Sequence, residues 1–316
     1  MSKIIKCVFS VTAAVLLALS AGCGKAADGG SGKIKVVCTV YPFYDWTVNI
    51  AGSSAEVDLI VSGGTDMHSY QPSAEDVIKI AGCDLLIYCG GASDAWVTEA
   101  VAQNENPGRT VINLLELLGS LAAKEEHTEG MQTDGHDHDG AEYDEHIWLS
   151  LKNAAFLTQK IAAALSEKDG ENAGAYSANA EEYKKRLESL DKKYEETVST
   201  AKNNTLVFAD RFPFLYLTRD YGIKYYAAFP GCSAETEASF ETVMFLSGKI
   251  DELGLKYIMT TESPVAGIAE TVRENTGDKN AEILALDSMQ SLTAENGQDY
   301  ISVMEKNLEV LEKALD

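Results

Sequence analysis

Histidine is the residue type in this chain best suited to metal chemistry, because a neutral imidazole nitrogen is a common ligand of transition metals. Five histidines occur, at positions 68, 127, 136, 138 and 146. His68 lies in GGTDMHSYQPSAED and His146 in EYDEHIWLS, each where a loop meets an expected element with apolar neighbours. A buried histidine that makes only structural contacts fits these positions as well as a metal ligand does. Spacing alone leaves both interpretations open.

The other three histidines lie in residues 125–145, a segment that also holds nine acidic residues and the tract HDHD. It shows neither strand nor helix periodicity, so we expect a loop. Imidazole and carboxylate at this density bind zinc or copper weakly. A solvated acidic loop without bound metal is the alternative.

Six cysteines occur, at positions 7, 23, 38, 83, 89 and 232. They contain no CxxC pair, and their spacing matches neither a zinc site nor a disulfide framework, although one bridge remains possible. Cys38, Cys83 and Cys89 lie in apolar, strand-like runs and are expected to be buried thiols. Cys232 lies in a loop beside a glycine.

The N-terminus reads as a processing signal. Lys3 and Lys6 precede an apolar run over residues 8–19, and small residues lead directly to Cys23. This arrangement resembles a lipobox, which predicts a signal peptide over 1–22, lipidation of Cys23 and a lipidated tether over 23–32. An uncleaved membrane anchor is the alternative, but a span needs about 20 apolar residues.

The excess of acidic residues limits the partners that the protein can bind. The chain has 316 residues, with 26 Lys and Arg against 49 Asp and Glu, for a net charge of −23. This acidity argues against nucleic acid as a partner, since phosphates require a basic surface. It suits a cation as ligand, and it serves solubility equally well.

These residues must be positioned by an α/β fold. Strand patterns occur at 34–40, 57–61, 84–88, 110–112, 205–209, 224–228, 256–260 and 282–286. Helical patterns occur at 43–51, 73–81, 93–104, 212–220, 236–252, 264–275 and 298–315. Such alternation predicts parallel sheets covered by helices. Ser73 is the expected N-cap of the second helix, with Asp76 three residues on.

One longer helical pattern covers about 172–202, with apolar residues at spacings of three and four. A coiled-coil dimer is the alternative for this helix, although few heptads fit. We therefore predict an N-terminal α/β lobe at 33–170, a linking helix at 171–202 and a C-terminal α/β lobe at 203–316. In an open α/β sheet, ligands bind at the carboxyl ends of the strands, which is where His68 falls.

Several stretches resemble the solute-binding lipoproteins of zinc and manganese ABC importers. They are 39–52, 63–78, 81–96, 144–149, 221–239, 260–277 and 283–316, including Gly-x-Asp-x-His-x-Tyr and Asp-x-His-Ile-Trp-Leu. The resemblance implies two α/β lobes joined by a rigid backbone helix, with one metal between the lobes. It also implies that the histidine-rich acidic loop belongs to the zinc-binding members.

The resemblance carries ligands over residue by residue. His68 and His146 match the two family histidines, and Asp287 matches the C-terminal carboxylate. The third family ligand, a His or Glu that opens a helix, falls on Arg211, whose guanidinium cannot ligate a cation. Asp210 is the replacement we predict. A thiolate from Cys232 is the second option.

A third option keeps three protein ligands plus water and pairs Arg211 with Asp287 or Glu237. In the family setting, Glu262 is expected to support the site rather than to bind metal.

The resemblance implies capture of a divalent metal outside the cytoplasmic membrane and delivery to an ABC importer permease, without catalysis. Two histidines with carboxylates favour Zn²⁺, and Mn²⁺ is the second candidate. We expect a monomer held on the extracytoplasmic face of the cell membrane by lipid. A metal-dependent hydrolase and a surface adhesin are the alternatives from other functional classes.

Overall fold

The computed structural model describes residues 32–62, 64–132, 143–233, 237–292 and 297–316. Their strands form two parallel four-stranded sheets, which confirms the predicted fold class. The first sheet contains β1 (Ile34–Cys38), β2 (Ala55–Leu59), β3 (Leu85–Tyr88) and β4 (Thr110–Asn113). The second contains β5 (Thr205–Phe212), β6 (Lys224–Pro230), β7 (Tyr257–Thr261) and β8 (Glu282–Leu286).

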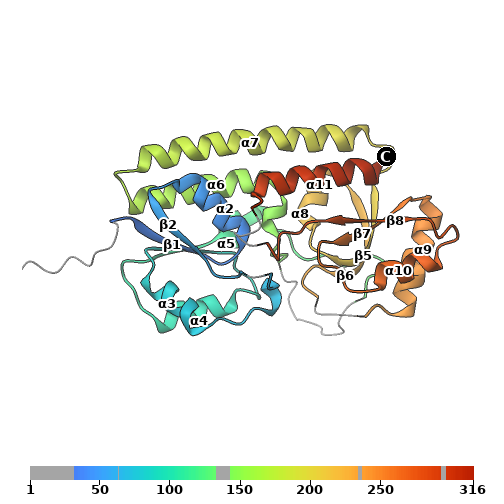
Figure 1. The fold of residues 1–316 in the computed structure, drawn as a ribbon, viewed down its shortest axis with the longest axis horizontal. Helices are drawn as coiled ribbons and strands as arrows, with labels where there is room; N and C mark the ends of the chain where they lie inside the picture. The colour runs from blue at the N-terminus through green and yellow to red at the C-terminus, as the bar shows by residue number, and fades with distance from the viewer. Residues whose placement is uncertain (1–31, 63, 133–142, 234–236, 293–296) are drawn as a thin grey trace, which may run out of the picture. The chain divides into compact units, whose positions relative to one another are not determined.

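Both sheets have the same strand order. The first runs β2-β1-β3-β4 and the second β6-β5-β7-β8, so in each sheet the second strand along the chain lies at an edge, beside the first. All neighbours are parallel, and each sheet therefore presents the carboxyl ends of its strands along one side. Figure 1 shows these two sheets with helices around them.

Helices α2 (Tyr41–Ala51), α3 (Ala74–Gly82) and α4 (Ala95–Gln103) connect the strands of the first sheet, together with the 3₁₀ turn η1 (Met67–Ser69). Helix α5 (Leu114–Leu118) and the 3₁₀ turn η2 (Gly119–Leu121) follow its last strand. The predicted cap of α3 is confirmed: Asp76 N–H donates to Ser73 Oγ, and the Asp76 carboxylate accepts from Ser73 N–H. This capping box ends the loop that carries His68 and fixes where the loop meets the helix.

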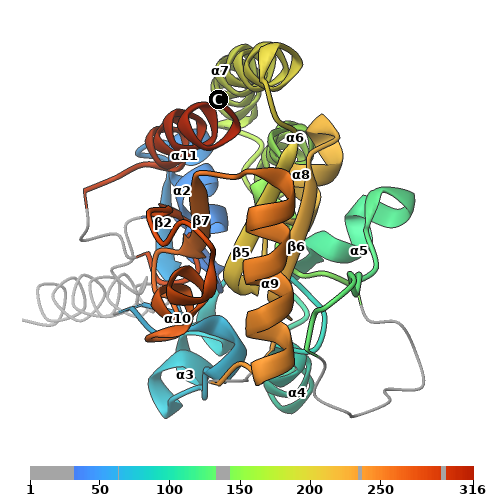
Figure 2. The same cartoon turned by 90° about the vertical axis from the view of Figure 1, so that its right-hand side faces the viewer.

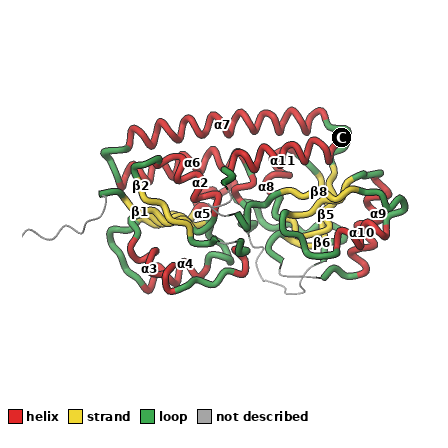
Figure 3. Tube along the Cα trace, viewed as in Figure 1, coloured by secondary structure: helices red, strands yellow, loops and turns green. Residues whose placement is uncertain are grey.

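The sequence analysis missed α6 (Leu151–Lys168), which follows the 3₁₀ turn η3 (Ile147–Leu149). A signal was present: Ser150 caps the helix by accepting from Asn153 N–H at 3.0 Å. Apolar residues at helical spacing then form a buried face, and the helix is rich in alanine, the strongest helix former. Figure 3 shows helices around both sets of strands.

Four helices accompany the second sheet: α8 (Leu215–Tyr221), α9 (Phe240–Leu253), α10 (Ile268–Asn275) and α11 (Tyr300–Leu315). Figure 2 shows α9 and α10 beside β5, β6 and β7, against which they pack. Strand β5 is longer than predicted, and α8 begins later. Pro213 explains this difference, because a residue that precedes proline favours extended backbone, and Phe212 therefore stays in the strand.

The predicted long helix is α7 (Ala173–Thr200). Its buried residues, Tyr176, Ala180, Tyr183, Leu187, Leu190 and Tyr194, are those of the predicted apolar stripe. This stripe packs against α2 and α6 of the first half and against α8 and α11 of the second (Figure 1). The stripe is therefore occupied within the chain, which removes the argument for a coiled-coil partner.

Helix α11 also links the two halves. The ring of Tyr300 meets that of Trp46 edge to face at 5.3 Å between centroids, and its hydroxyl donates to Trp148 O. Tyr194 Oη in α7 donates to Met304 O at 2.6 Å. All four aromatic side chains are fully buried, so these contacts hold α11, α7 and the first half in one core.

Some of the predicted features lie outside the described residues. They are Cys23, most of the predicted tether, His136 and His138. Cys38, Cys83 and Cys89 are buried free thiols, as predicted. A search of the described helices finds none with the length and hydropathy that crossing a bilayer requires.

Asp45 offers a test of the packing between α2 and α7. Its carboxylate is buried and accepts a hydrogen bond from Tyr183 Oη at 3.0 Å, and burial raises its pKa from 3.8 to about 6. The folded chain thus holds this proton more tightly than the unfolded chain, so the stabilisation is complete below pH 3.8 and is lost as the pH rises through about 6.

Asp45→Asn should therefore raise the free energy of unfolding at neutral pH by about 1–3 kcal/mol, since each pKa unit corresponds to about 1.4 kcal/mol. Urea unfolding at a series of pH values measures this. Asp58→Asn, at an exposed position, is the control and should change little. A less stable Asp45→Asn at neutral pH would contradict the argument.

Candidate metal centre

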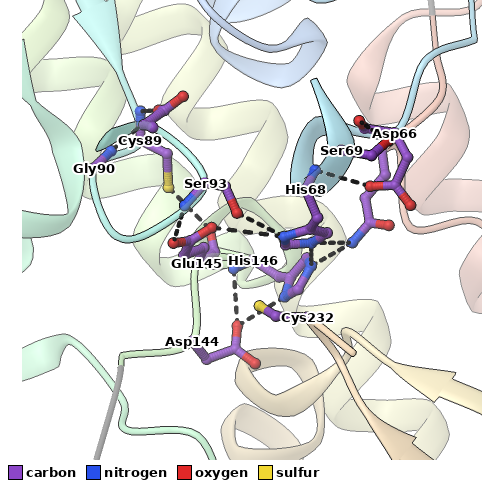
Figure 4. A network of polar contacts seen from close by, with 12 residues as sticks. Asp66, His68, Ser69, Cys89, Gly90, Ser93, Asp144, Glu145, His146 and Cys232 are labelled. Atoms are coloured by element: carbon purple, nitrogen blue, oxygen red, sulfur yellow. Dashed lines mark hydrogen bonds and ion pairs between the residues drawn. The ribbon is translucent and has the colours of Figure 1, made fainter. Parts of the chain in front are cut away.

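The carboxyl ends of strands from both sheets meet at one group of side chains. His68 follows β2, Ser93 follows β3, Cys232 follows β6 and Gln290 follows β8. His146 precedes η3, in the segment between the halves. Figure 4 shows His68, His146 and Cys232 pointing toward one another. The shared strand direction in each sheet is what brings these loops together.

His68 is oriented from both sides. The side chain of Asp66 caps η1 by accepting from His68 N–H at 3.0 Å, which fixes the backbone. The ring Nδ1 lies 2.7 Å from Ser93 Oγ. The amide nitrogen of Gln290 faces the ring Nε2 at 3.3 Å, and when Nε2 accepts from this amide, Nδ1 carries the proton and donates to Ser93.

His146 is fully buried and is held by Asp144. The Asp144 carboxylate accepts from His146 N–H at 2.8 Å and from the ring Nδ1 at 3.1 Å. This bond places the proton on Nδ1 and leaves the Nε2 lone pair free. Gly231 makes room for the ring, since a Cβ there would lie 3.0 Å from His146 Cε1 and 2.9 Å from Phe212 O.

The two free lone pairs converge. Nε2 of His68 and Nε2 of His146 are 3.1 Å apart, and with no proton between them they would repel. The amide nitrogen of Gln290 contacts both Nε2 atoms and has two hydrogens to offer them. A positively polarised group thus lies where two imidazoles point, which is the position a cation would occupy.

A sulfur atom completes this cluster. Among the described residues, only His68, His146 and Cys232 bring three potential ligand atoms within 4.8 Å of one another. Two imidazole nitrogens and one sulfur form a donor set that zinc favours. The cluster fits a metal ion.

The electrostatics of the cluster favour a neutral His68. Burial, and secondly the neighbouring His146, lower the pKa of His68 to about 3. Neutral imidazole is the form that binds metal, so His68 needs no deprotonation near neutral pH. Burial raises the pKa of the Cys232 thiol well above its usual range, and a metal must displace that proton to form a thiolate.

Glu145 places a carboxylate beside this cluster. Its Oε1 accepts from Ser93 N–H at 3.0 Å, while its buried Oε2 has no hydrogen-bond partner and lies 3.8 Å from His68 Nδ1. At that distance a neutral His68 forms no ion pair with it. Burial raises the pKa of Glu145. A cation bound to His68 would interact favourably with this carboxylate.

Asp210, the predicted replacement ligand, lies outside the cluster. It is fully buried, and its Oδ2 accepts from Thr261 N–H at 2.8 Å and from Thr261 Oγ1 at 2.6 Å. Its Oδ1 accepts from Val265 N–H at 3.3 Å. Both carboxylate oxygens therefore anchor the end of β7, and the structure gives Asp210 a structural role.

Asp287, the expected C-terminal carboxylate, is also absent from the cluster. Its carboxylate accepts from Met289 N–H at 2.8 Å, and its own N–H donates to Asn307. Burial, with a smaller effect of Glu262, raises its pKa to about 6. Asp287 shapes the turn after β8, and Gln290, three residues later, reaches the histidines.

Arg211 forms a different ion pair from the two proposed for it. Its Nη1 lies 2.7 Å from Asp66 Oδ2, so it pairs with neither Asp287 nor Glu237. It also lies at the end of β5 rather than opening α8. Asp66 is the residue that caps η1, and the arginine therefore joins the second sheet to the loop of His68.

Gln290 is the site residue that the sequence analysis missed. The sequence analysis expected a carboxylate ligand, Asp287, in this part of the chain and assigned no role to the nearby amide. Its loop is held by Glu262, which accepts from Ser288 N–H at 2.8 Å and from the hydroxyls of Ser288 and Ser291. This agrees with the supporting role expected for Glu262. The exposed His127 belongs to no such cluster.

Comparison with known proteins gives the family. The family model described as "Zinc-uptake complex component A periplasmic" matches residues 36–314. The chain belongs to this family. The resemblance found in the sequence is thereby confirmed.

Two curated relatives are named for zinc. The zinc-binding lipoprotein AdcA of Streptococcus pneumoniae (strain ATCC BAA-255 / R6) is 33% identical over all of this chain and 62% of its own length. The high-affinity zinc uptake system protein ZnuA of Bacillus subtilis is 28% identical over 97% of this chain and 96% of its own length.

Among solved structures, Zn(II)-bound AdcA from Streptococcus pneumoniae has a TM-score of 0.72 and 30% identity. The match covers 90% of this chain and 58% of the AdcA chain. The chain thus spans about six tenths of the AdcA relatives that it matches.

Asp144 offers a test of how His146 is held. Asp144→Ala removes the acceptor of Nδ1–H and should weaken zinc binding by about 10–100-fold, as is typical when a group that orients a metal ligand is lost. Asp144→Asn retains an acceptor oxygen and should fall between this variant and the parent. Competition with a zinc-chelating dye measures both. Equal affinity in all three would contradict the role given to Asp144.

Gln290 offers a second test. Gln290→Glu places an anionic oxygen beside the two imidazoles and should strengthen zinc binding by about tenfold, or about 1.4 kcal/mol. Gln290→Ala removes the side chain and shows how zinc affinity changes when the amide no longer contacts the two imidazoles. Titration calorimetry compares the three proteins. Weaker zinc binding by Gln290→Glu would show that the amide does not lie where the ion binds.

Proposed function

We propose that this chain captures a divalent metal ion, zinc, outside the cytoplasmic membrane and delivers it to an ABC importer. The observation that carries the proposal is the pair of imidazoles, with Nε2 of His68 and Nε2 of His146 3.1 Å apart and each Nδ1 atom held by a polar partner, Ser93 or Asp144. Two preorganised imidazoles lower the entropy cost of assembling a metal site.

Zinc is the ion that these donors favour. Imidazole suits zinc, and manganese prefers carboxylate, carbonyl and water oxygens. The two acidic residues expected as ligands lie outside the cluster, which weakens the case for manganese. The relatives named for zinc binding and zinc uptake support the same choice.

Binding followed by release describes this site better than catalysis. A hydrolytic zinc needs an open position for the attacking water. Here His146 is fully buried, and the family model that matches the chain describes a component of zinc uptake. We therefore propose a carrier of metal ions, and not the metal-dependent hydrolase considered as an alternative.

The proposal includes attachment to the membrane. A signal peptide over 1–22 and lipidation at Cys23 would hold the protein, as a monomer, on the extracytoplasmic face, beside the permease it serves. The lobes at 33–170 and 203–316 would then present the metal site from the end of a tether over 23–32. Two or more acyl chains suffice for stable anchoring.

His68→Ala tests the function. The purified soluble chain should bind about one zinc ion, and the variant should lose it, because one of the two converging imidazoles is gone. Zinc at about 100 times its Kd should stabilise the parent by about 2.7 kcal/mol and the variant by much less. Mass spectrometry of metal content and thermal unfolding provide the two measurements.

His127→Ala is the matched control, since it removes an exposed histidine outside the cluster. Delivery is tested by uptake of radioactive zinc into cells that produce the parent or the His68→Ala protein. Uptake that is equal in both would overturn the proposed function and favour a surface adhesin.

A further inference from the structure

The family resemblance leaves this site one ligand short, because the third family position holds Arg211. The structure gives that arginine another partner. Its Nη1 pairs with Asp66 Oδ2 at 2.7 Å. Asp210, next to it, has both carboxylate oxygens bound at the end of β7. Neither residue can supply the missing ligand.

Cys232 is placed to supply it. It lies two residues after β6, and its Sγ is within 4.8 Å of ligand nitrogens of both His68 and His146. The preceding Gly231 packs directly against the His146 ring, since a Cβ there would lie 3.0 Å from His146 Cε1. The absence of a side chain at Gly231 therefore lets the loop bring the sulfur to the histidines.

The other cysteines of the described chain are placed differently. Cys38, Cys83 and Cys89 are buried in the first half; Cys83 Sγ donates to Ile80 O and Cys89 Sγ to Glu145 O. Cys232 alone among the described cysteines shares a cluster with the histidines. Packing within the hydrophobic core explains the first three, whereas Cys232 lies outside that core and beside two imidazoles.

We propose that Cys232 is the third protein ligand of the metal, which makes this a site of two imidazoles and one thiolate. Coordination breaks the S–H bond, forms a sulfur–metal bond and releases the proton to solvent. This inference rests on the proposed function and specifies its cargo.

A thiolate ligand selects ions such as zinc and disfavours manganese, which prefers oxygen. The sulfur thus adds to the preference of the two imidazoles for zinc over manganese, and the permease is supplied mainly with zinc-like ions.

Cobalt(II) reports on the sulfur directly, since a cobalt–thiolate bond gives an intense charge-transfer absorption in the near ultraviolet. The soluble chain loaded with cobalt should show this band, and zinc should displace it. Cys232→Ser should lose the band and bind zinc at least about tenfold more weakly, since even loss of a group that only orients a ligand costs about 10–100-fold. Cys83→Ser is the matched control and should keep the band.

A second measurement does not depend on folding of the variant. Zinc should protect Cys232 of the parent chain from alkylation, with the modified cysteines identified by peptide mass spectrometry. Cys232→Asp should shift the ratio of zinc to manganese affinity toward manganese by at least about tenfold, because it replaces sulfur with oxygen.

The outcomes separate the two proposals. Zinc binding that depends on His68, without a cobalt–thiolate band and without protection of Cys232, overturns the thiolate ligand and leaves the proposed function intact. If no part of the zinc binding depends on His68, both the thiolate ligand and the proposed function are overturned.

Discussion

The structure depends on one electrostatic constraint: the Nε2 atoms of two imidazoles face each other across 3.1 Å. Such an arrangement is unfavourable unless a proton, another hydrogen-bond donor or a cation is shared by the two nitrogens. Each ring is held in place from behind, His68 by Ser93 and His146 by Asp144, so neither can turn away at low cost. The Gln290 amide satisfies both in the structure. A metal ion would do the same more strongly.

The fold serves this constraint by bringing two sheets together at their carboxyl ends. Helices α7 and α11 pack against both halves and hold the two sheets in place through buried aromatic contacts. Arg211 adds an ion pair to the loop of His68. The family resemblance predicts a ligand at the position of Arg211. In this chain the same position joins the two halves, and a sulfur donor lies in the next loop of the second sheet.

Much of this could be predicted from sequence. The apolar stripe of α7, the capping box at Ser73 and the parallel strands follow from periodicity and local hydrogen bonding. Loop-to-element junctions made His68 and His146 candidates, and the family resemblance, rather than their spacing, selected them as predicted ligands. The helix α6 was missed, although its Ser150 cap and buried face were readable.

The rest of the site depends on tertiary geometry that no local pattern encodes. Asp210 and Asp287 carry the right charge, yet their oxygens are bound to nearby backbone N–H groups, which sequence spacing does not reveal. Gln290 reaches the histidines from a loop fixed by Glu262, far away along the chain. From the sequence, Cys232 is one of several possible third ligands. Its selection depends on how closely Gly231 approaches His146, which only the folded structure shows.

The shared strand order has a consequence for the site. Strands β2 and β6 hold equivalent places at the edges of their sheets, so His68 and Cys232 lie in loops that follow corresponding strands. The site therefore draws a nitrogen donor from one sheet and a sulfur atom from the matching place in the other, and any movement that separates the two sheets would pull these atoms apart.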